Sequence, residues 1–484
     1  MSLAGMPRRE LRLLPDSSRV IIRPFIPGDE RRIATVLGRV LSLEEEEAER
    51  GLDSLRVEFA NRHLDIEGKW LANFERIRRF VFTQRPLSRN RELLLGAFFS
   101  GEYALESAAL FNPSIVPHPD QTGLAEGAMR FLLSLRATGE GHISSIEFRS
   151  GVIEKDSGMR MESVSRFASA TESVKDADYD KRAFVVKLKE IGFDNEYSAA
   201  VLRELPGQFS QEGLRASLDY ARRSTRPATR DLHRTLDSMQ WLADSNYEIQ
   251  FPAGLALSER VIFPVSPTES KGIEDARFVR FVEDDGTARY YATYTAYDGR
   301  AILSQLIETS DFLRFKMSSL IGDGVRNKGM ALFPRRVGGH YAMLGRQDDE
   351  NVSIMFSDDL HYWRNPQLVL RPAELWESVK VGNCGSPIET EAGWLVLTHG
   401  VGPMRKYCIG AALFDLEDPT RIIGRLREPL IAPEGAEREG YVPNVVYSCG
   451  AMLYGRELVL PYAMSDTATI ISRIALDALL DELK

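Results

Sequence analysis

The sequence predicts a mainly β protein, a five-bladed β-propeller with an α-helical region before it and an α-helical insertion after its first blade. Three observations predict this fold: short strand-like segments separated by turn residues, a repeat of those segments at a nearly constant spacing, and two long stretches with helical periodicity. The predicted division is 1–104 for the N-terminal helical region, 105–180 for the first blade, 181–246 for the helical insertion and 247–484 for the remaining blades.

The first helical stretch runs from about Asp29 to Leu110. Over residues 30–82 apolar residues recur at three- and four-residue steps, with no internal proline. In "SLEEEE" we expect Ser42 to be the N-cap, with glutamates in the first turn of a solvated helix that has no functional role. A second helical stretch runs from about Lys181 to Ser245, and proline and glycine interrupt it at 205–208 and 225–229.

The β part contains a repeat. "EDARFVRF" begins at 274, "MALFPRRV" at 330, "GSPIETEAGWLVLTHG" at 385 and "PNVVYSCGAMLYGRELVLPYA" at 443, so the steps are 56, 55 and 58 residues. Units of four strands at this period are what propeller blades require. The segment "FNPSIVPHPDQTGLAEGAMRFLLSLRATG" has the same layout and makes a fifth, earlier unit. Two separate β domains are the alternative, which the even spacing disfavours.

The composition excludes some classes of partner. The chain has 484 residues, 43% hydrophobic and 27% charged, and a net charge of −9, which argues against nucleic acid as the main partner. The three cysteines stand in separate strand-like segments, which indicates buried thiols in a reducing compartment. The chain start lacks the apolar region of a signal peptide, and no run of 18 apolar residues could cross a membrane. We therefore expect a cytoplasmic protein with no membrane partner.

Polar residues on or just after the innermost strand of each blade should converge on one channel. Asp275 and Arg277 raise the sharpest question, because in "KGIEDARFVRF" they open an otherwise apolar strand and an unpaired buried charge is costly. Arg277 is expected to orient the site or to pair with Glu274. The other candidates are Asn112, Arg136, Lys328, Arg346, Lys380, His399, Tyr407, Asn444 and Asp466.

Structural explanations exist for several of these candidates. Lys328 could lie in a solvated loop, Arg346 could pair with a following aspartate, and His399 could be a satisfied core histidine. The aromatic residues of the strands are expected to pack the blades and not to bind sugar. These are Trp394, Phe333 and Trp363.

Several longer strings resemble one family. "GIEDAR", "NKGMALFPRR", "KVGNCGSPIETEAGWLVLTHG", "YCIGAALFDLEDP", "VPNVVYSCGAML" and "YAMSDT" are similar to the β-mannoside phosphorylases of glycoside hydrolase family 130. The resemblance covers about 105–160 and 250–484, in order and without large gaps. The family fold is a five-bladed propeller, which agrees with the repeat count. The helical parts lie outside the common core, and they are plausible interface material, which favours a homo-oligomer.

The resemblance implies roles for individual residues. Asp275 takes the position of the catalytic acid, and Arg136, Asp466 and Asn112 match residues that hold the mannosyl ring. The phosphate-binding positions fall on Lys328, Arg346, Lys380, His399 and Tyr407. Three residues depart from the usual pattern: Ala276 replaces a proline, Tyr441 stands where some members carry an aspartate, and Lys328 is an arginine in some members.

These roles make chemical sense together. An inverting glycosidase needs a second carboxylate to activate water, and the sequence offers no convincing partner for Asp275. Inorganic phosphate is already an anionic nucleophile, and it needs only cationic and hydrogen-bonding residues to hold it. We expect inverting phosphorolysis of a β-mannoside to α-mannose 1-phosphate, with phosphate as co-substrate, no metal and no organic cofactor. To donate its proton at neutral pH, Asp275 should have a raised pKa.

Three rival functions remain open at this stage. A β-mannoside hydrolase would use the same fold, but its members are expected to lose the phosphate-binding set, which is kept here. A β-mannosyltransferase differs from a phosphorylase in the donor it uses, and the sequence does not separate the two. A non-catalytic glycan-binding propeller would not need so many polar residues around one channel.

Overall fold

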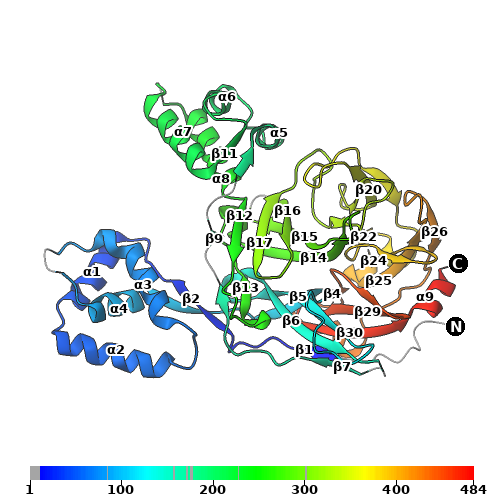
Figure 1. Cartoon of the computed structure of the whole chain (residues 1–484), viewed down its shortest axis with the longest axis horizontal. Helices are drawn as coiled ribbons and strands as arrows, with labels where there is room; N and C mark the ends of the chain where they lie inside the picture. The colour runs from blue at the N-terminus through cyan, green and yellow to red at the C-terminus, as the bar shows by residue number, and fades with distance from the viewer. Residues whose placement is uncertain are drawn as a thin grey trace.

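A computed structural model describes residues 11–83, 86–155, 158–170, 173–174, 178–226, 228–299 and 302–483. The chain is mainly β, as predicted, and its β part carries two helical additions (Figure 1). One addition extends to the side along β2, and the other stands over β12 and β17. Residues 1–10, on which the expectation about a signal peptide rests, lie outside the described ranges. None of the helices within those ranges is both long and apolar enough to cross a bilayer.

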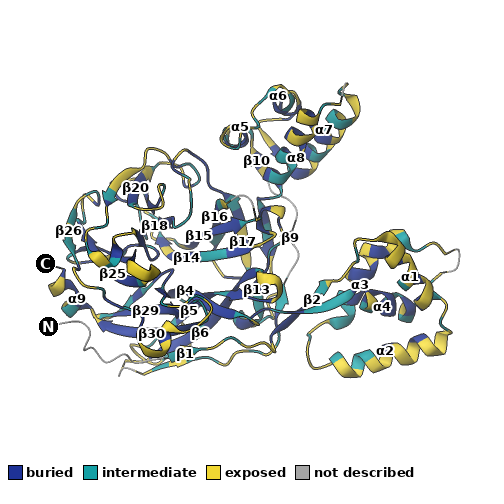
Figure 2. Ribbon diagram, turned by 180° about the vertical axis from the view of Figure 1, so that it is seen from behind, coloured by how far each residue is buried: buried dark blue, intermediate teal, exposed yellow. Residues whose placement is uncertain are grey.

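The N-terminal helical region lies between two paired strands, β2 (Val20–Pro24) and β3 (Ser100–Ala104). Its helices are α1 (Glu30–Leu41), α2 (Glu45–Phe59), α3 (Ile66–Ile77) and α4 (Arg89–Phe98). The helical stretch therefore ends before Leu110, because the chain is already extended from Ser100. The apolar stripes of α1, α3 and α4 pack together, whereas most of α2 is exposed (Figure 2).

The predicted N-cap at Ser42 is wrong. Ser42 is the C-cap of α1, and its hydroxyl donates to the Arg39 carbonyl. The next helix starts after Glu44, whose side chain forms a capping box with Glu47. The glutamate run thus caps its own helix, because a carboxylate close to the first turn satisfies the free N–H groups as well as a hydroxyl does.

The described part of the helical insertion contains four helices, one more than the two predicted interruptions give, because the chain also breaks between Glu190 and Glu196. They are α5 (Lys181–Glu190), α6 (Glu196–Arg203), α7 (Gln211–Ser224) and α8 (Arg230–Ala243). Strands β10 (Asp178–Asp180) and β11 (Gln208–Ser210) pair at its base. Apolar residues of all four helices form a core of their own, so the insertion is a separately packed unit.

The β part consists of successive antiparallel groups. The first two belong to one 12-stranded sheet. Their main strands are β4 (Ala109–Pro117), β5 (Met129–Thr138) and β6 (Ser144–Ile153), then β14 (Gly272–Val282), β15 (Ala288–Tyr297), β16 (Ile302–Thr309) and β17 (Arg314–Ser319). Shorter strands complete this sheet: β7 (Met159–Met161), β8 (Ser169–Ala170), β9 (Ser173–Val174), β12 (Tyr247–Gln250) and β13 (Arg260–Ile262).

Three further groups follow as separate sheets. The third has β18 (Ala331–Leu332), β19 (Tyr341–Gly345), β20 (Val352–Ser357) and β21 (Gln367–Leu370). The fourth has β22 (Lys380–Asn383), β23 (Ile388–Thr390), β24 (Gly393–Val401), β25 (Tyr407–Phe414) and β26 (Ile422–Arg425). The fifth has β27 (Val446–Tyr447), β28 (Met452–Tyr454), β29 (Glu457–Met464) and β30 (Ala468–Ala475), before α9 (Leu476–Glu482).

Strand β1 (Leu11–Leu13) pairs antiparallel with β30, so the start of the described chain joins its last sheet. Each predicted repeat start lies in, or within a few residues of, the first strands of a group. Phe333, Trp363 and Trp394 are fully buried, and the Phe333 and Trp394 rings lie 5.0 Å apart, edge to face. The predicted packing role of these aromatic residues is confirmed. Cys384, Cys408 and Cys449 are free and buried.

Candidate active site

Two strained strand positions build the centre of the site. The β14–β15 ladder shifts register between Glu274 and Arg277, and the β4–β5 ladder shifts between Phe111 and Ser114. Inside these bulges Asp275 has φ +55° and Asn112 has φ +48°. Such backbone costs about 1–3 kcal/mol per residue and is concentrated at functional sites. The bulges bring Asn112 Nδ2 to 2.7 Å from Asp275 Oδ1.

Arg136 joins the two acidic residues of β14. Its Nη2 donates to Glu274 Oε1 at 2.8 Å, and its Nη1 lies 3.3 Å from Asp275 Oδ1. The Lys328 ammonium lies 3.3 Å from the other oxygen of Glu274. Asn112, Arg136, Lys328 and Asp275, four of the predicted site residues, therefore meet around one pair of carboxylates.

The predicted raised pKa of Asp275 is wrong. Burial raises its pKa, but the positive charges of Arg136, Lys328 and Arg277, with the hydrogen bond from Asn112, outweigh burial and hold it below the usual value. Asp275 is therefore ionised at neutral pH in the ligand-free protein.

Asp275 also has a second carboxylate within electrostatic reach, contrary to the sequence-based expectation. Asp466 follows β29 with φ +52°. Burial, and then the negative charges of Asp275 and Glu274, raise the pKa of Asp466 to about 6, although Arg136 partly opposes this. The environments of Asp275 and Asp466 thus push their pKa values apart, a pattern typical of acid–base sites.

His399 and Arg346 form the second half of the site. Arg346 Nη1 lies 2.9 Å from His399 Nε2, and both side chains are buried. Burial, with the charges of Arg346, Arg277 and Lys380, holds the pKa of His399 well below its usual value. The imidazole is therefore neutral, and its Nε2 accepts the hydrogen bond from Arg346. The Tyr407 ring stacks beside it, with ring centroids 6.1 Å apart.

Lys380 lies at the edge of this group. Its ammonium is 3.1 Å from Asp349 Oδ2, and the other oxygen of Asp349 is 3.7 Å from Arg346 Nη2. In the part of the chain that the structure describes, the buried Nε of Arg346 has no hydrogen-bond partner. We call Arg277, Arg346, Lys380 and Asp349 the cationic corner. It holds three positive charges against one carboxylate and leaves a buried donor free, as an anion-binding site requires.

Arg277 connects the two halves. It donates to the carbonyls of Gly329 and Asn383, at 3.2 and 2.9 Å, and to the Tyr447 hydroxyl at 2.6 Å. Arg277 does not pair with Glu274 as one prediction had it, because the Glu274 carboxylate is paired with Arg136 and Lys328.

Gly329, which directly follows Lys328, lies between the two guanidinium groups. A β-carbon at Gly329 would be 3.5 Å from Arg346 Nε and 3.7 Å from Arg277 Nη2. Lys328, Arg346, His399, Tyr407 and Lys380 are therefore linked by a continuous chain of contacts that reaches Asp275.

One residue that the sequence did not single out belongs to this site. The Tyr447 ring lies 5.0 Å from the His399 ring, and its hydroxyl holds Arg277. Its only sequence signal is its place in "VPNVVYSCGAML". The side-chain oxygen of Asn444 accepts from Arg438 Nε at 2.8 Å, and its backbone carbonyl accepts from the Tyr407 N–H at 3.0 Å. Among the described residues, no group of three or more His, Cys, Asp or Glu side chains could hold a metal ion.

A carboxyl group next to the cationic corner is an arrangement that group-transferring enzymes use. Residues 242–484 match the family described as beta-1,4-mannooligosaccharide phosphorylase. The chain belongs to this family, glycoside hydrolase family 130, and the predicted family is confirmed.

Similar proteins carry related names. A 1,2-beta-oligomannan phosphorylase of Thermoanaerobacter sp. (strain X514) is 36% identical over 218 residues, 44% of this chain and 71% of that protein. A beta-1,2-mannobiose phosphorylase of Listeria innocua is 32% identical over 215 residues, 43% of this chain and 59% of that protein. A solved structure of the Listeria innocua beta-1,2-mannobiose phosphorylase with beta-1,2-mannobiose aligns at 21% identity and a TM-score of 0.46, over 79% of this chain and 93% of that one.

Proposed function

We propose that this protein cleaves β-mannosides by inverting phosphorolysis and releases α-mannose 1-phosphate. The observation that carries the proposal is the free Nε of buried Arg346, in a corner with three cations and one carboxylate beside Asp275. Two unbalanced positive charges match the charge of hydrogen phosphate. The named activities of the relatives support the same reaction.

In the proposed reaction a phosphate oxygen bonds to the anomeric carbon of the mannosyl ring. The bond from that carbon to the acceptor oxygen breaks on the opposite face, so the configuration inverts. The acceptor oxygen takes up a proton that originates from Asp275, passed through the 3-hydroxyl of the sugar or given directly. Arg136, Asn112 and Asp466 hold the mannosyl ring, and Lys328, Arg346, Lys380, His399 and Tyr407 hold phosphate.

Asp275 must be protonated for this step, although cations lower its pKa in the ligand-free protein. Bound phosphate places negative charge among those same cations. This reduces their effect on Asp275, while the sugar removes water from the carboxyl group, and both changes raise its pKa. Asp275 therefore carries the proton that the reaction needs only when phosphate and sugar are both bound.

The first experiment measures products from β-1,2-mannobiose, because the two relatives compared above are named for β-1,2-linked substrates. Reactions with and without phosphate are assayed for mannose 1-phosphate and free mannose. We expect mannose 1-phosphate only with phosphate. Release of mannose at equal rates without phosphate would reject phosphorolysis.

A β-mannoside hydrolase is the second candidate, because Asp466 lies within electrostatic reach of Asp275 and could activate water. In that case Asp466→Asn would abolish a phosphate-independent release of mannose. Under phosphorolysis, Asp466→Asn chiefly raises the KM for the mannoside, since Asp466 then only holds the sugar.

We also propose that the five antiparallel groups are the blades of one propeller, with β1 completing the fifth. The division into 1–104, 105–180, 181–246 and 247–484 follows from this arrangement. We place the protein in the cytoplasm, where reducing conditions keep its three buried cysteines as thiols. The exposed helical additions favour a homo-oligomer, which light scattering of the purified protein would test.

A further inference from the structure

Two side chains of α5 hold the β part where the helical insertion meets it. Lys187 Nζ donates to the Leu320 carbonyl at 2.8 Å and lies 3.1 Å from Glu190 Oε2. The other oxygen of Glu190 accepts from the Gly322 N–H at 2.6 Å. The Lys187 side chain is only 7% exposed, so this contact is an internal one.

These bonds satisfy backbone groups that a neighbouring strand would otherwise pair. The N–H and carbonyl of Ile321 pair with His361 and Trp363, at 2.8 and 2.7 Å, along one edge of the segment. In extended backbone the neighbouring Leu320 carbonyl and Gly322 N–H face the other edge, and buried backbone groups need partners. Lys187 and Glu190 supply them, so α5 is bonded directly to the backbone of this segment.

The same segment leads to the phosphate-binding residues. Gly322 has φ +118°, and a β-carbon there would lie 1.9 Å from the Trp363 carbonyl, so its backbone is closely confined. Five residues later Asn327, next to Lys328, donates to the Arg346 carbonyl at 3.3 Å. A shift of Gly322 would therefore be passed along a short segment to Lys328.

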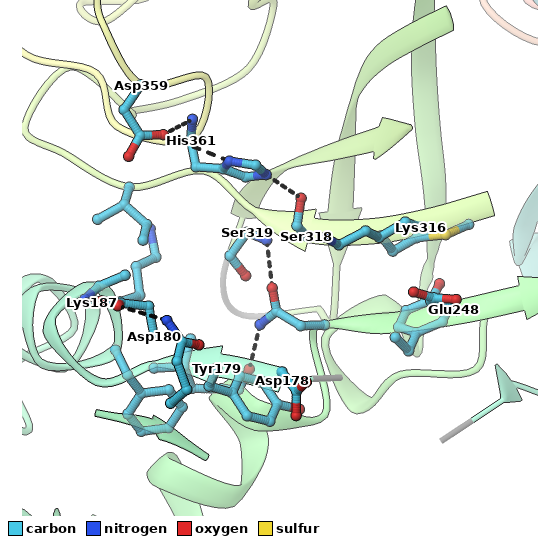
Figure 3. Close-up of a pocket in the computed structure, with 18 residues that line it drawn as sticks. Asp178, Tyr179, Asp180, Lys187, Glu248, Lys316, Ser318, Ser319, Asp359 and His361 are labelled. Atoms are coloured by element: carbon cyan, nitrogen blue, oxygen red, sulfur yellow. Dashed lines mark hydrogen bonds and ion pairs between the residues drawn. The ribbon is translucent and has the colours of Figure 1, made fainter. Parts of the chain in front are cut away.

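A cavity of about 460 Å³ lies beside this contact (Figure 3). Side chains from both sides line it, including Lys187 and Tyr179 from the insertion and Ser319 and His361 from the β part. In the described chain the buried Ser319 hydroxyl has no hydrogen-bond partner. Because the cavity separates the insertion from the β part at this place, apolar side chains do not pack the two together there. The position of the insertion relative to the β part therefore depends more on the bonds of Lys187 and Glu190.

We propose that Lys187 and Glu190 are positioning residues that place Lys328 through the segment 320–328 and so set the affinity for phosphate. This inference rests on the proposed function. It gives the insertion a role in the reaction although none of its described residues bonds to a residue of the site.

The test compares Lys187→Met and Glu190→Ala with the unaltered enzyme, with phosphate and β-1,2-mannobiose varied in turn. We expect the KM for phosphate to rise about fivefold, and kcat and the KM for mannobiose to change by less than about twofold. Lys187→Arg keeps a donor and should restore most of the phosphate affinity. Lys189→Met, an exposed lysine on the same helix, is the matched control and should change nothing.

Amide exchange gives a readout that does not depend on activity. In Lys187→Met the amides of residues 322–328 should exchange faster, while those of β24 stay unchanged. An unchanged KM for phosphate in both folded variants, or unchanged exchange, overturns the proposal. An equal rise in the KM of both substrates with a lower Tm also overturns it, in favour of a purely structural role. Failure of the proposed function is seen separately, as phosphate-independent mannose release by the unaltered enzyme.

Discussion

The molecule contains two groups of charged residues that differ in their burial and in their balance of charge. In the first, which we call the quartet, Arg19 and Arg149 face Glu106 and Glu147. Arg19 lies 2.8 and 2.7 Å from the two glutamates, and Arg149 lies 2.5 and 3.2 Å from them. The quartet ties the segment before β2 to β6, and all four side chains are almost fully buried.

In the cationic corner only Arg277 and Arg346 are buried, whereas the side chain of Asp349 is 54% exposed, and the charges are not balanced. It sets three positive charges against Asp349 and leaves the Nε donor of Arg346 free. The quartet pairs two arginines with two glutamates, and its unpaired buried atom is an acceptor, Glu147 Oε1. Burial of charge alone therefore does not mark a functional site in this fold. An excess of one sign together with a free buried donor is what we expect of a ligand-binding site, and this expectation is what the following variants test.

The sharpest test of this comparison removes one carboxylate from the quartet and, separately, the carboxylate of Asp275 beside the cationic corner. Asp275→Asn should lower the rate of phosphorolysis about 10³-fold, within the range expected for loss of a general acid. It should also lower Tm at neutral pH, because the cations that hold the pKa of Asp275 below its usual value stabilise the folded protein through the ionised carboxylate. Glu106→Gln should leave kcat unchanged, because among the described residues no side-chain bond of the quartet goes to a residue of the site. It should change Tm little, because burial and the charge of Glu147 already raise the pKa of Glu106 to about 7. Product assays and thermal unfolding of both variants check this. Retained activity in Asp275→Asn would move the acid elsewhere.

The second prediction concerns stability. Arg149→Met leaves Glu106 and Glu147 with one cation, and breaking a buried charge pair costs about 3–5 kcal/mol. We expect a loss of that order in the free energy of unfolding, measured by urea titration, with kcat unchanged in the folded fraction. Arg314→Met, which breaks the exposed ion pair to Glu248, is the control and should cost under about 1 kcal/mol. Equal losses would mean that the quartet does not stabilise the fold.

The third prediction separates phosphate binding from sugar binding. Arg346→Met removes the donor that bonds His399 and the free Nε, so the KM for phosphate should rise about 10- to 100-fold, as loss of a charged hydrogen bond predicts. The KM for the mannoside should stay within about twofold. Steady-state kinetics with each substrate varied measures both. A rise confined to the mannoside would assign Arg346 to the sugar.

Much of the fold and the site was predictable from the sequence, because residues close together in the chain determine where strands, turns and helices form. The spacing of "EDARFVRF" and its later counterparts depends on alternation and turns within about 20 residues of each start, and the structure places a β group at each of them. The family was predictable for the same reason, since its strings are continuous in sequence. The helical insertion was found from periodicity alone.

What failed depends on contacts between distant residues. The pKa of Asp275 was predicted with the wrong sign because Arg136, which lowers it, is 139 residues away and Asn112 is 163 residues away. Glu274 was assigned to Arg277 for the same reason, although Arg136 and Lys328 hold it in the folded chain. Tyr447 was missed because its hydroxyl meets Arg277 only across two sheets.

The smallest expected effect is a fraction of a proton taken up when phosphate binds. Near pH 5 to 6 Asp275 is ionised in the free protein, because cations lower its pKa. Phosphate offsets those cations, so the pKa of Asp275 rises and protons are taken up as phosphate binds. The quartet gives no such signal, since phosphate does not reach Glu106, although burial and Glu147 raise its pKa to about 7.

Calorimetry of phosphate binding at pH 5.5, in two buffers of different ionisation enthalpy, measures this uptake. Dihydrogen phosphate, the main form at this pH, itself loses a proton when it binds as hydrogen phosphate. The uptake by Asp275 is therefore the difference in buffer dependence between the unaltered enzyme and Asp275→Asn, and Glu106→Gln should leave the buffer dependence unchanged. Asp466 is the other group that could take up the proton, because its pKa is raised to about 6. If the buffer dependence is unaltered in Asp275→Asn and altered in Asp466→Asn, the proton is held by Asp466, and the roles of the two carboxylates must be exchanged.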